Sequence, residues 1–364
     1  MPGDFAPMDS QTIMVCRLPL GYYSNGPARG TRHWAKRRSG LRALITGSGG
    51  FAGGHLAEYL LEQTDWEVAG LDLVEGRSAA WRSRMILRVG DILTDLPQLQ
   101  SFFAEVHPDY VFHLAAQAFV PSSWADPWST LANNIRGQLN VLLSAIGLAK
   151  MPRVLVIGSA EEYGAVTAAE LPIGENTPLR PTSPYAVSKV AQDALGYQYF
   201  ASHKLPVVRV RPFNHIGPGQ SPAFVTSDFA KQIAEAEVGL REPVLRVGNL
   251  EGRRDFSDVR DIVRGYWLAL TLGEPGHVYN LGAERSYSVR QVLDILLSMS
   301  RVRLSVEQDP KRLRPADIPD LVADCSQFRS RTGWKTTISI EQSLADILEY
   351  WRSHLERPAP ATGI

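Results

Sequence analysis

The chain has 364 residues and carries 38 basic and 38 acidic side chains, so its formal net charge is +0. Hydrophobic residues make up 44% and charged residues 21%, which is ordinary for a globular protein with one large domain or two joined lobes. The balanced charge excludes a strong general attraction to nucleic acid or anionic lipid. Any bound anion must therefore be held by a few placed arginines or lysines.

The cysteines and the apolar runs indicate in which cellular compartment the protein is expected. Cys16 and Cys325 form no metal-binding or redox spacing, which favours a reducing compartment, and we assign no metal ligand. No apolar run reaches the length of a membrane span, and no apolar core follows the basic residues near the N-terminus. We therefore expect a cytoplasmic protein with no membrane or nucleic-acid partner.

The first 212 residues begin with an irregular segment, after which predicted strands and helices alternate regularly. Residues 1–40 are rich in Gly, Pro and Arg, and we interpret them as a disordered extension, or as an upstream start with Met14 as the alternative. Apolar runs then predict buried strands at 41–46, 66–72, 109–115, 153–159 and 205–211, with helical patterns between them at 51–63 and 129–150. This alternation predicts an α/β fold, a Rossmann-type doubly wound parallel sheet over residues 41–212.

After Pro212 the alternation loosens. Helices are predicted at 227–239, 288–300 and 340–355, and a strand at 243–249. We interpret residues 213–355 as mostly a smaller substrate-binding lobe, interleaved with the first, and 356–364 as a tail.

A glycine-spaced turn joins the first predicted strand to the first helix. Gly47 permits the tight turn, Gly50 lets the backbone approach a pyrophosphate, and Gly53 allows close packing of helix and strand. The helix N-terminus offers unpaired N–H groups and the positive end of its dipole to phosphates. The turn therefore predicts a dinucleotide site, to which we also assign Phe51.

Residues at the ends of the following strands complete this predicted site. Asp72 is placed to accept a hydrogen bond from a ribose 2′-hydroxyl and to repel a 2′-phosphate, which mildly favours NAD(H) over NADP(H). Arg77 lies close enough in sequence to keep NADP(H) open. Asp91 and Ile92 are candidates for the adenine pocket, and Ala115 is assigned to the same cofactor site.

A tyrosine, a lysine and a serine form the predicted catalytic set. Tyr185 and Lys189 are four residues apart, on one face of a predicted helix, and Ser159 ends a predicted strand. A tyrosine with a pKa near 10 is a poor acid/base at neutral pH, and a neighbouring ammonium group is expected to lower that pKa. Ser159 would hydrogen-bond the reacting oxygen, while Lys189 also holds the nicotinamide ribose.

Five segments occur in a characteristic order: TGSGGFAG, HLAAQ, YAVSK, RPFNHIGPGQ and RRDFSDVRD. With them, residues 41–355 resemble the extended short-chain dehydrogenase/reductase family of nucleotide-sugar enzymes. The resemblance implies Ser159, Tyr185 and Lys189 as the catalytic triad. It also implies that Asn134 distorts a helix and helps to position the lysine.

The resemblance further implies a nucleoside diphosphate-sugar substrate, whose phosphates guanidinium groups can bind in forks. The candidate substrate-binding residues are Ser123, Asn214, Lys231, Arg254 and Arg314. Asp317 is a further candidate for a ribose hydroxyl. Members of the family dimerise through two helices per subunit, so we expect a homodimer with a four-helix interface at residues 127–150 and 184–203. The apolar segment LNVLLSAIGL has more apolar surface than one sheet face needs, which agrees with burial against a second copy.

Within the family, the segments SPAFVTSDFAKQI, VGNLEGRRDFSDVRDI and RPADIP look most like GDP-6-deoxy-D-mannose reductases. These reduce the C4 ketone of GDP-4-dehydro-6-deoxy-D-mannose to GDP-D-rhamnose. GDP-mannose 4,6-dehydratase is the alternative, because Glu161 lies two residues beyond Ser159, where a dehydratase needs the base that removes the C5 proton. A nucleotide-sugar 4-epimerase and a non-enzymatic cofactor-sensing scaffold are further alternatives.

Three departures favour the reductase over the dehydratase. The glycine turn lacks the Gln-Asp-Gly of GDP-mannose dehydratases, Ala160 stands where they carry a serine or an acid, and Glu162 where they carry an apolar residue. We keep Glu161 in the catalytic set as a carboxylate that orients sugar hydroxyls. We expect Glu162 to turn away from the sugar and to pair with an arginine.

Overall fold

The computed structural model describes residues 40–74, 83–312 and 320–355. The expected N-terminal extension and C-terminal tail lie outside the described residues, and so do Met14, Cys16, Arg77, Arg314 and Asp317. All elements below belong to one compact unit, Arg37–Ile364.

Seven parallel strands form the main sheet, in the order β10-β6-β5-β4-β1-β2-β3. They are β1 (Arg42–Thr46), β2 (Glu67–Asp72), β3 (Ile86–Val89), β4 (Tyr110–His113), β5 (Arg153–Ile157), β6 (Val207–Pro212) and β10 (Val278–Leu281). The chain order reverses between β1 and β4, which is the arrangement of a doubly wound Rossmann sheet. The predicted fold class is confirmed, and the predicted strands are found to within a few residues.

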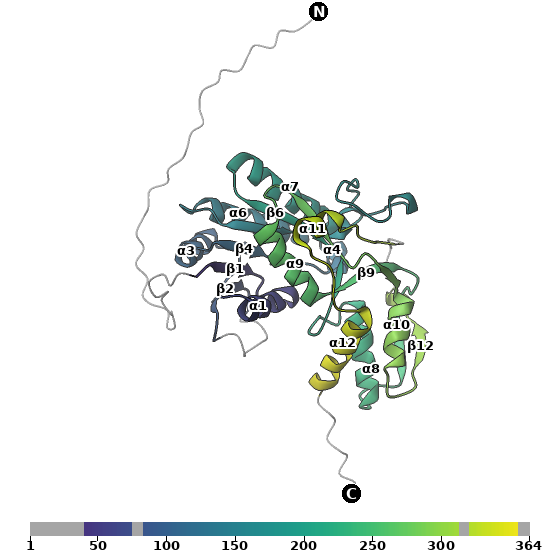
Figure 1. Cartoon of the computed structure of the whole chain (residues 1–364). Coiled ribbons are helices and arrows are strands. Elements are labelled where there is room, and N and C mark those ends of the chain that lie inside the picture. The colour runs from purple at the N-terminus through teal and green to yellow at the C-terminus, as the bar shows by residue number, and fades with distance from the viewer. Residues whose placement is uncertain (1–39, 75–82, 313–319, 356–364) are drawn as a thin grey trace, which may run out of the picture. The chain divides into compact units, whose positions relative to one another are not determined.

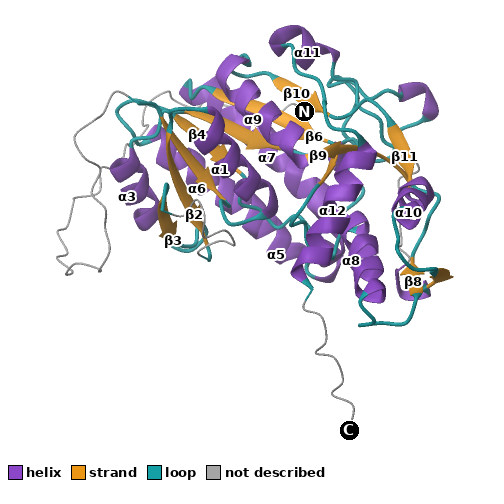
Figure 2. Ribbon diagram, turned by 60° about the horizontal axis from the view of Figure 1, so that its bottom comes forward, coloured by secondary structure: helices purple, strands orange, loops and turns teal. Residues whose placement is uncertain are grey.

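Helices cover both faces of this sheet (Figures 1 and 2). On one face, α1 (Phe51–Gln63) packs against α9 (Val259–Leu272). On the other, α6 (Gly137–Ile146) packs between α3 (Leu96–Val106) and α7 (Pro184–His203). The core between the layers contains fully buried side chains such as Ile45, Phe112 and Leu155. Burial on both faces explains why these strands read as continuous apolar runs.

A second, smaller lobe has its own sheets and core. It contains a three-stranded sheet of β7 (Asn214–Ile216), β9 (Arg253–Asp258) and β11 (Ser286–Ser288), and a pair formed by β8 (Val244–Val247) and β12 (Ser305–Gln308). Three helices, α8 (Val225–Glu237), α10 (Val289–Ser298) and α12 (Ile340–His354), bury a separate apolar cluster around Phe229, Leu293 and Leu344. They lie together below and to the right of the main sheet in Figure 1.

Segments that follow residue 212 also contribute to the main sheet and its core. Helix α9 and strand β10 return from the second half of the chain to the main sheet, where β10 pairs with β6. Helix α11 (Ser326–Thr332) and Trp334 also pack into the large core. Strand β10 is thereby the edge strand of the main sheet next to β6.

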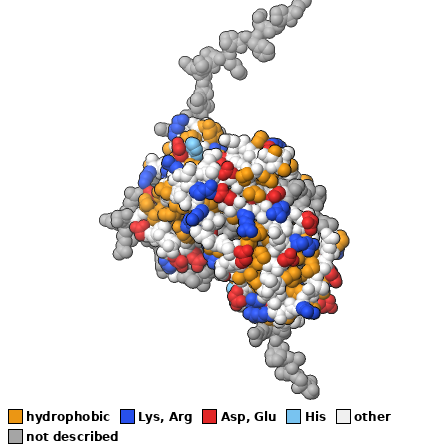
Figure 3. Space-filling view, turned by 45° about the vertical axis from the view of Figure 1, so that its right-hand side comes forward, with side chains coloured by type: hydrophobic (Ala, Val, Ile, Leu, Met, Phe, Trp, Pro, Cys, Tyr) orange, Lys and Arg blue, Asp and Glu red, His pale blue; other side chains and the backbone are white. Residues whose placement is uncertain are grey.

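The single helix expected over 129–150 is interrupted. After α4 (Val120–Ala125), the chain forms α5 (Pro127–Leu131), a π-helical turn (Ala132–Arg136) and then α6. Short 3-10 turns occur at Ala160–Glu162, Ala168–Glu170 and Pro310–Arg312. Among the described residues, no helix combines the length and apolar character needed to cross a bilayer. On the face in Figure 3, basic and acidic side chains are interspersed, in line with the balanced net charge.

Candidate active site

The glycine turn brings β1, α1 and β4 into close contact. Gly47 has φ +75°, and a Cβ atom there would lie 2.6 Å from the backbone nitrogen of Ala115. A Cβ atom at Gly53 would overlap the carbonyl group of Gly47. The turn therefore needs glycine at both positions, for backbone conformation and for space. The structure places Gly47, Gly53 and Ala115 together, as the sequence predicts.

The same turn fits a dinucleotide pyrophosphate. Helix α1 begins at Phe51, with Gly50 as its N-cap, and among the described residues no side chain caps this end. The first turn of the helix also contains no acidic residue. Its first N–H groups and the positive end of its dipole are therefore suited to an anion.

Asp72 and Asp91 hold the loops at the neighbouring strand ends. The carboxylate of Asp72 accepts hydrogen bonds from the backbone N–H groups of Gly49 (2.8 Å) and Leu73 (2.7 Å). Asp91 accepts one from the N–H of Leu93 (2.8 Å), and Ile92 beside it is buried. Both aspartates thus lie where the sequence places them, at the carboxyl ends of β2 and β3, and both order backbone there.

Ser159, Tyr185 and Lys189 come together at the end of β5 and the start of α7. The ammonium group of Lys189 donates a 2.9 Å hydrogen bond to the carbonyl oxygen of Ile157 and lies 5.9 Å from the centre of the Tyr185 ring. Tyr185 hydrogen-bonds with Ser159, whose hydroxyl also accepts from the N–H of Glu161 (3.2 Å). All three predicted triad side chains are buried. The arrangement can present a hydroxyl pair to one substrate oxygen.

The expected lowering of the pKa of Tyr185 is wrong for the protein without a bound cofactor or substrate. Burial raises the pKa of Tyr185 above its usual 10, and the carboxylates of Glu161 and Glu162 act in the same direction against the hydrogen bond with Ser159. Burial also lowers the pKa of Lys189 to about 8, against the attraction of Glu162. Desolvation penalises both charged forms, and this outweighs the mutual attraction of phenolate and ammonium. Tyr185 is therefore a protonated phenol at neutral pH.

Asn134 lies in the π-helical turn and is fully buried. Its side chain accepts a hydrogen bond from the N–H of Gln117 (2.8 Å) and donates to the carbonyl oxygen of the same residue (3.0 Å). The predicted helix distortion at this asparagine is confirmed. A π-helical turn widens the helix locally and is frequent at functional sites.

The two adjacent glutamates have different environments. Glu161 is partly buried, and its charge acts on Tyr185. Glu162 is fully buried, accepts a hydrogen bond from the N–H of Ser159 (2.8 Å) and pairs with Nε of Arg211 (3.1 Å). The expected pairing of Glu162 with an arginine is confirmed. Sequence reasoning did not identify the arginine. Arg211 lies on β6, and only the fold places β6 beside β5, the strand that precedes Glu162.

The candidate substrate residues divide into two groups. Asn214 is exposed at the start of β7, and Arg254 is partly buried on the adjacent strand β9, so the fold brings these two together. Lys231 is instead 3.5 Å from a carboxylate oxygen of Glu235, with its ammonium group 5.4 Å from the Trp351 ring centre. The hydroxyl of Ser123 is fully buried and donates to the carbonyl oxygen of Val120 (2.7 Å). Contacts of Ser123 and Lys231 with a substrate stay predictions.

His55 and His215 join the cofactor turn to the second lobe, a connection that the sequence analysis did not single out. The ring of Phe51 stacks on His215, with centroids 6.1 Å apart and planes inclined by 5°. Nε2 of His55 lies 2.9 Å from the carbonyl oxygen of Pro218. The signal was present in RPFNHIGPGQ, where His215 directly follows Asn214, but only the fold shows its partner on α1.

Comparison with known proteins identifies related families. A family model described as GDP-mannose 4,6 dehydratase matches residues 44–347. GDP-6-deoxy-D-mannose reductase from Pseudomonas aeruginosa is 37% identical over 319 residues, which cover 86% of this chain and 98% of that protein. GDP-mannose 4,6-dehydratase from Vibrio cholerae is 30% identical over 362 residues, covering 86% and 95%.

Solved structures give the same picture. The P. aeruginosa protein RMD complexed with NADPH has a TM-score of 0.77 and 35% identity, covering 86% of this chain and 100% of that one. UDP-glucose 4-epimerase from Thermus thermophilus in complex with NAD has a TM-score of 0.78 and 29% identity, with the same coverage. The resemblance to nucleotide-sugar enzymes is thus confirmed. The reductase, dehydratase and epimerase activities that the sequence left open all occur among these relatives.

Proposed function

This chain belongs to the GDP-mannose 4,6-dehydratase family, and we propose that within it the protein reduces the C4 ketone of GDP-4-dehydro-6-deoxy-D-mannose to GDP-6-deoxy-D-mannose, that is, GDP-D-rhamnose. It is an NAD(P)-dependent nucleotide-sugar oxidoreductase of the short-chain dehydrogenase/reductase type. Carbonyl reduction is supported by the buried hydroxyl pair of Ser159 and Tyr185 beside Lys189, which can donate to one substrate oxygen. The same groups would also serve dehydration or epimerisation, so the choice of the reductase rests on similarity. The greater identity to the reductase (37%) than to the dehydratase (30%) supports it.

The glycine turn and the N-terminus of α1 would hold the cofactor pyrophosphate, and Asp72 the adenosine ribose. Lys189 would hold the nicotinamide ribose. When bound, the reduced nicotinamide supplies the hydride. Tyr185 donates its phenolic proton to the oxygen that develops charge at C4, and Ser159 donates a hydrogen bond to the same oxygen. Both donors are already in place before the reaction, so this stabilisation needs little reorganisation.

On the substrate side, we assign the diphosphate to Arg254 and Asn214, which lie on adjacent strands. Arg314, in the segment beyond the described residues, stays a candidate for the same role. Lys231 would have to exchange Glu235 for a phosphate oxygen in order to take part. Glu161 orients sugar hydroxyls beside Tyr185.

The cofactor preference is a separate proposal. Asp72 at the end of β2 mildly favours NAD(H), because a carboxylate repels a 2′-phosphate. The related P. aeruginosa structure contains NADPH, so both reduced cofactors belong in the assay.

We also propose that two copies of the chain associate through α5, α6 and α7. Apolar side chains are exposed here: Trp128 (77%) on α5, and Tyr197 (51%) and Val187 (45%) on α7. On α6, Val141, Leu142 and Ala145 are fully buried within the chain, whereas Leu139, Leu143 and Ile146 are partly exposed. Exposed aromatic and apolar side chains of this size favour burial against a partner.

Two reactions of the purified protein test the function. The first contains GDP-4-dehydro-6-deoxy-D-mannose with NADH or NADPH, and the second GDP-mannose with a catalytic amount of NAD or NADP. Oxidation of the reduced cofactor with a two-hydrogen gain in sugar mass in the first reaction supports the reductase. Loss of water from GDP-mannose in the second overturns it. The variant Glu161→Gln distinguishes the two activities further. A reductase should keep its turnover within about tenfold, whereas a dehydratase that loses its base should lose turnover by about 100-fold or more.

A further inference from the structure

The carboxylate of Glu162 lies next to the catalytic Ser159 and has no role in the proposed reaction. Glu162 is fully buried, and its Oε1 atom accepts the N–H of Ser159 at 2.8 Å. This oxygen fills the space that a side chain at Gly158 would occupy. The hydroxyl of Ser159 accepts a hydrogen bond from the N–H of Glu161. Ser159 and Glu162 thus form a reciprocal capping box at the start of the 3-10 turn. The carboxylate of Glu162 thus fixes the backbone of Ser159.

Glu162 continues into a buried ionic network between β5, β6 and α7. Its Oε2 atom lies 3.1 Å from Nε of Arg211, and the same guanidinium group pairs with the carboxylate of Asp193. Asp193 lies on α7 one helical turn after Lys189. Arg211 also donates to the hydroxyl of Tyr163 (3.1 Å). The network therefore links the turn that carries the serine to the helix that carries the lysine and tyrosine.

We propose that Glu162 is a positioning residue for this active site, which fixes Ser159 through its backbone N–H and stabilises the charged ammonium form of Lys189. The proposal deepens the proposed function and rests on it for its kinetic readout alone. Removing the carboxylate should therefore affect the serine and the lysine separately. The two effects can be separated because one depends on a hydrogen-bond acceptor and the other on a charge.

The charges around Lys189 support the second role. Burial lowers the pKa of Lys189, and the carboxylate of Glu162 is the group that opposes this. The ammonium group faces Ile157 on β5, Tyr185 on α7 and His113 on β4, and it contributes to the low pKa of that histidine.

The groups facing Glu162 itself are Asp193 and Lys189 from α7 and Arg211 from β6. Burial and Asp193 raise its pKa to about 8, while Arg211, the N–H of Ser159 and Lys189 act in the opposite direction, so the charge of Glu162 develops in the pH range in which Lys189 titrates. Glu162 and Lys189 thus stabilise each other's charged forms in a site from which water is excluded.

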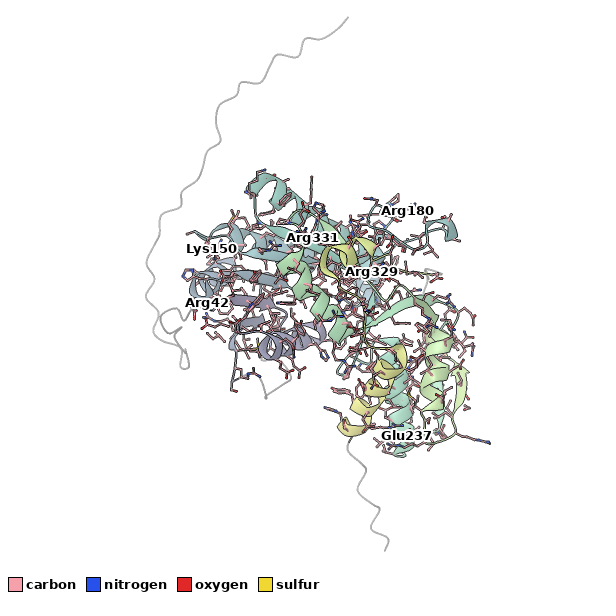
Figure 4. All side chains as sticks on the ribbon, in the orientation of Figure 1. Arg42, Lys150, Arg180, Glu237, Arg329 and Arg331 are labelled. Carbon is pink, nitrogen blue, oxygen red and sulfur yellow. The ribbon has the colours of Figure 1, made fainter. Side chains whose placement is uncertain are left out.

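Two substitutions separate the roles. Glu162→Gln keeps an oxygen that can accept from Ser159 but removes the charge, so the pKa of Lys189 should fall by about one unit. Glu162→Asp keeps the charge but shortens the side chain, so the pKa of Lys189 should stay near its wild-type value while kcat falls about tenfold through loss of the contact with Ser159. Glu170→Gln is the matched control. Glu170 closes the same kind of capping box with Thr167 on another 3-10 turn, and its partner Arg180 is labelled in Figure 4, away from the main sheet.

The pKa of Lys189 is measured by NMR with 13Cε-labelled lysine. The chain has only seven lysines, and Lys189→Arg assigns the signal. This titration needs no substrate, so it decides the charge role even if the wild-type protein fails to reduce the keto-sugar. In the kinetic assay, the alkaline limb of kcat against pH should move to lower pH in Glu162→Gln and stay in place in Glu162→Asp and Glu170→Gln.

An unchanged pKa of Lys189 in folded Glu162→Gln overturns the proposal, and so does an equal shift in Glu170→Gln. Circular dichroism and thermal unfolding establish that each variant is folded. If neither Glu162 variant folds, the glutamate is needed for stability, and the positioning role is wrong.

Discussion

The side-chain amide of Asn134 donates a hydrogen bond of 2.8 Å to the hydroxyl of Ser188, the residue directly before Lys189. The hydroxyl of Ser188 donates in turn to the carbonyl oxygen of Tyr185 (2.6 Å). One buried side chain in the π-helical turn therefore contacts the stretch of α7 that carries both the tyrosine and the lysine, besides the backbone of Gln117.

Replacing this asparagine should affect the site and the fold together. Asn134→Ala removes the contacts with Ser188 and Gln117, so we expect a loss of about 1–3 kcal/mol in the free energy of unfolding and a fall of kcat by about tenfold or more. Denaturant unfolding and steady-state kinetics measure the two effects. As a control, Ser144→Ala removes a buried hydroxyl that donates a hydrogen bond within α6, and it should lower stability without a comparable loss of kcat. Equal kinetic losses in both variants would contradict a positioning role for Asn134.

Tyr185→Phe tests the proposed proton donor. The variant keeps the ring in its buried position and loses only the hydroxyl, so turnover should fall by about 10²–10⁴ while cofactor binding stays within a few-fold. Turnover is followed by cofactor absorbance, and binding by quenching of tryptophan fluorescence. Retained turnover would exclude Tyr185 as the donor, and a scaffold protein would keep partner binding unchanged in this variant.

The cofactor turn can be tested at Gly47. An alanine there would place Cβ against the backbone of Ala115 in a backbone conformation with φ +75°, so we expect cofactor affinity to fall strongly and stability to fall by about 1–3 kcal/mol. Gly239 has the same φ, but a Cβ atom there meets nothing within 4 Å. Gly239→Ala should therefore reproduce the backbone strain and leave cofactor affinity unchanged. Titration calorimetry with NADH and NADPH compares the two variants.

His113 should make the protein sensitive to acid. Burial, together with the charge of Lys189, lowers its pKa from 6.5 to about 3, so the folded protein binds fewer protons than the unfolded chain between these values. Stability then rises with pH in this window, and each pH unit below 6.5 costs about 1.4 kcal/mol through this group. His113→Asn should flatten the dependence between pH 4 and 6.5, measured by urea unfolding. Replacing the exposed His203 in the same way should leave the slope unchanged.

The proposed dimer predicts a change in mass. Trp128→Glu places a charge where the exposed tryptophan of α5 would meet the partner copy, so we expect a shift from dimer to monomer in analytical ultracentrifugation. Leu240 is similarly apolar and 48% exposed, but it follows α8 in the small lobe, three residues after Glu237, which Figure 4 labels. Leu240→Glu should leave the mass unchanged. A monomeric wild-type protein would contradict the dimer.

Local patterns in the sequence were enough for five of the seven strands of the main sheet, the glycine turn and the pairing of Tyr185 with Lys189. A parallel strand buried on both faces is apolar along most of its length, and a helix places residues four apart on one face, so both features are visible within short segments. The same holds for Gly47, because the tight turn and the close approach to Ala115 leave no space for a side chain.

The protonation of the site and the partners of its buried charges were decided only by the tertiary structure. The sequence suggested that Lys189 would lower the pKa of Tyr185, but desolvation acts on every buried group and depends on the whole surrounding fold. Arg211 reaches Glu162 from another strand, and β10 returns to the main sheet from the far half of the chain. Long-range contacts of this kind leave no periodic signal, because they depend on how segments pack rather than on how one segment is composed.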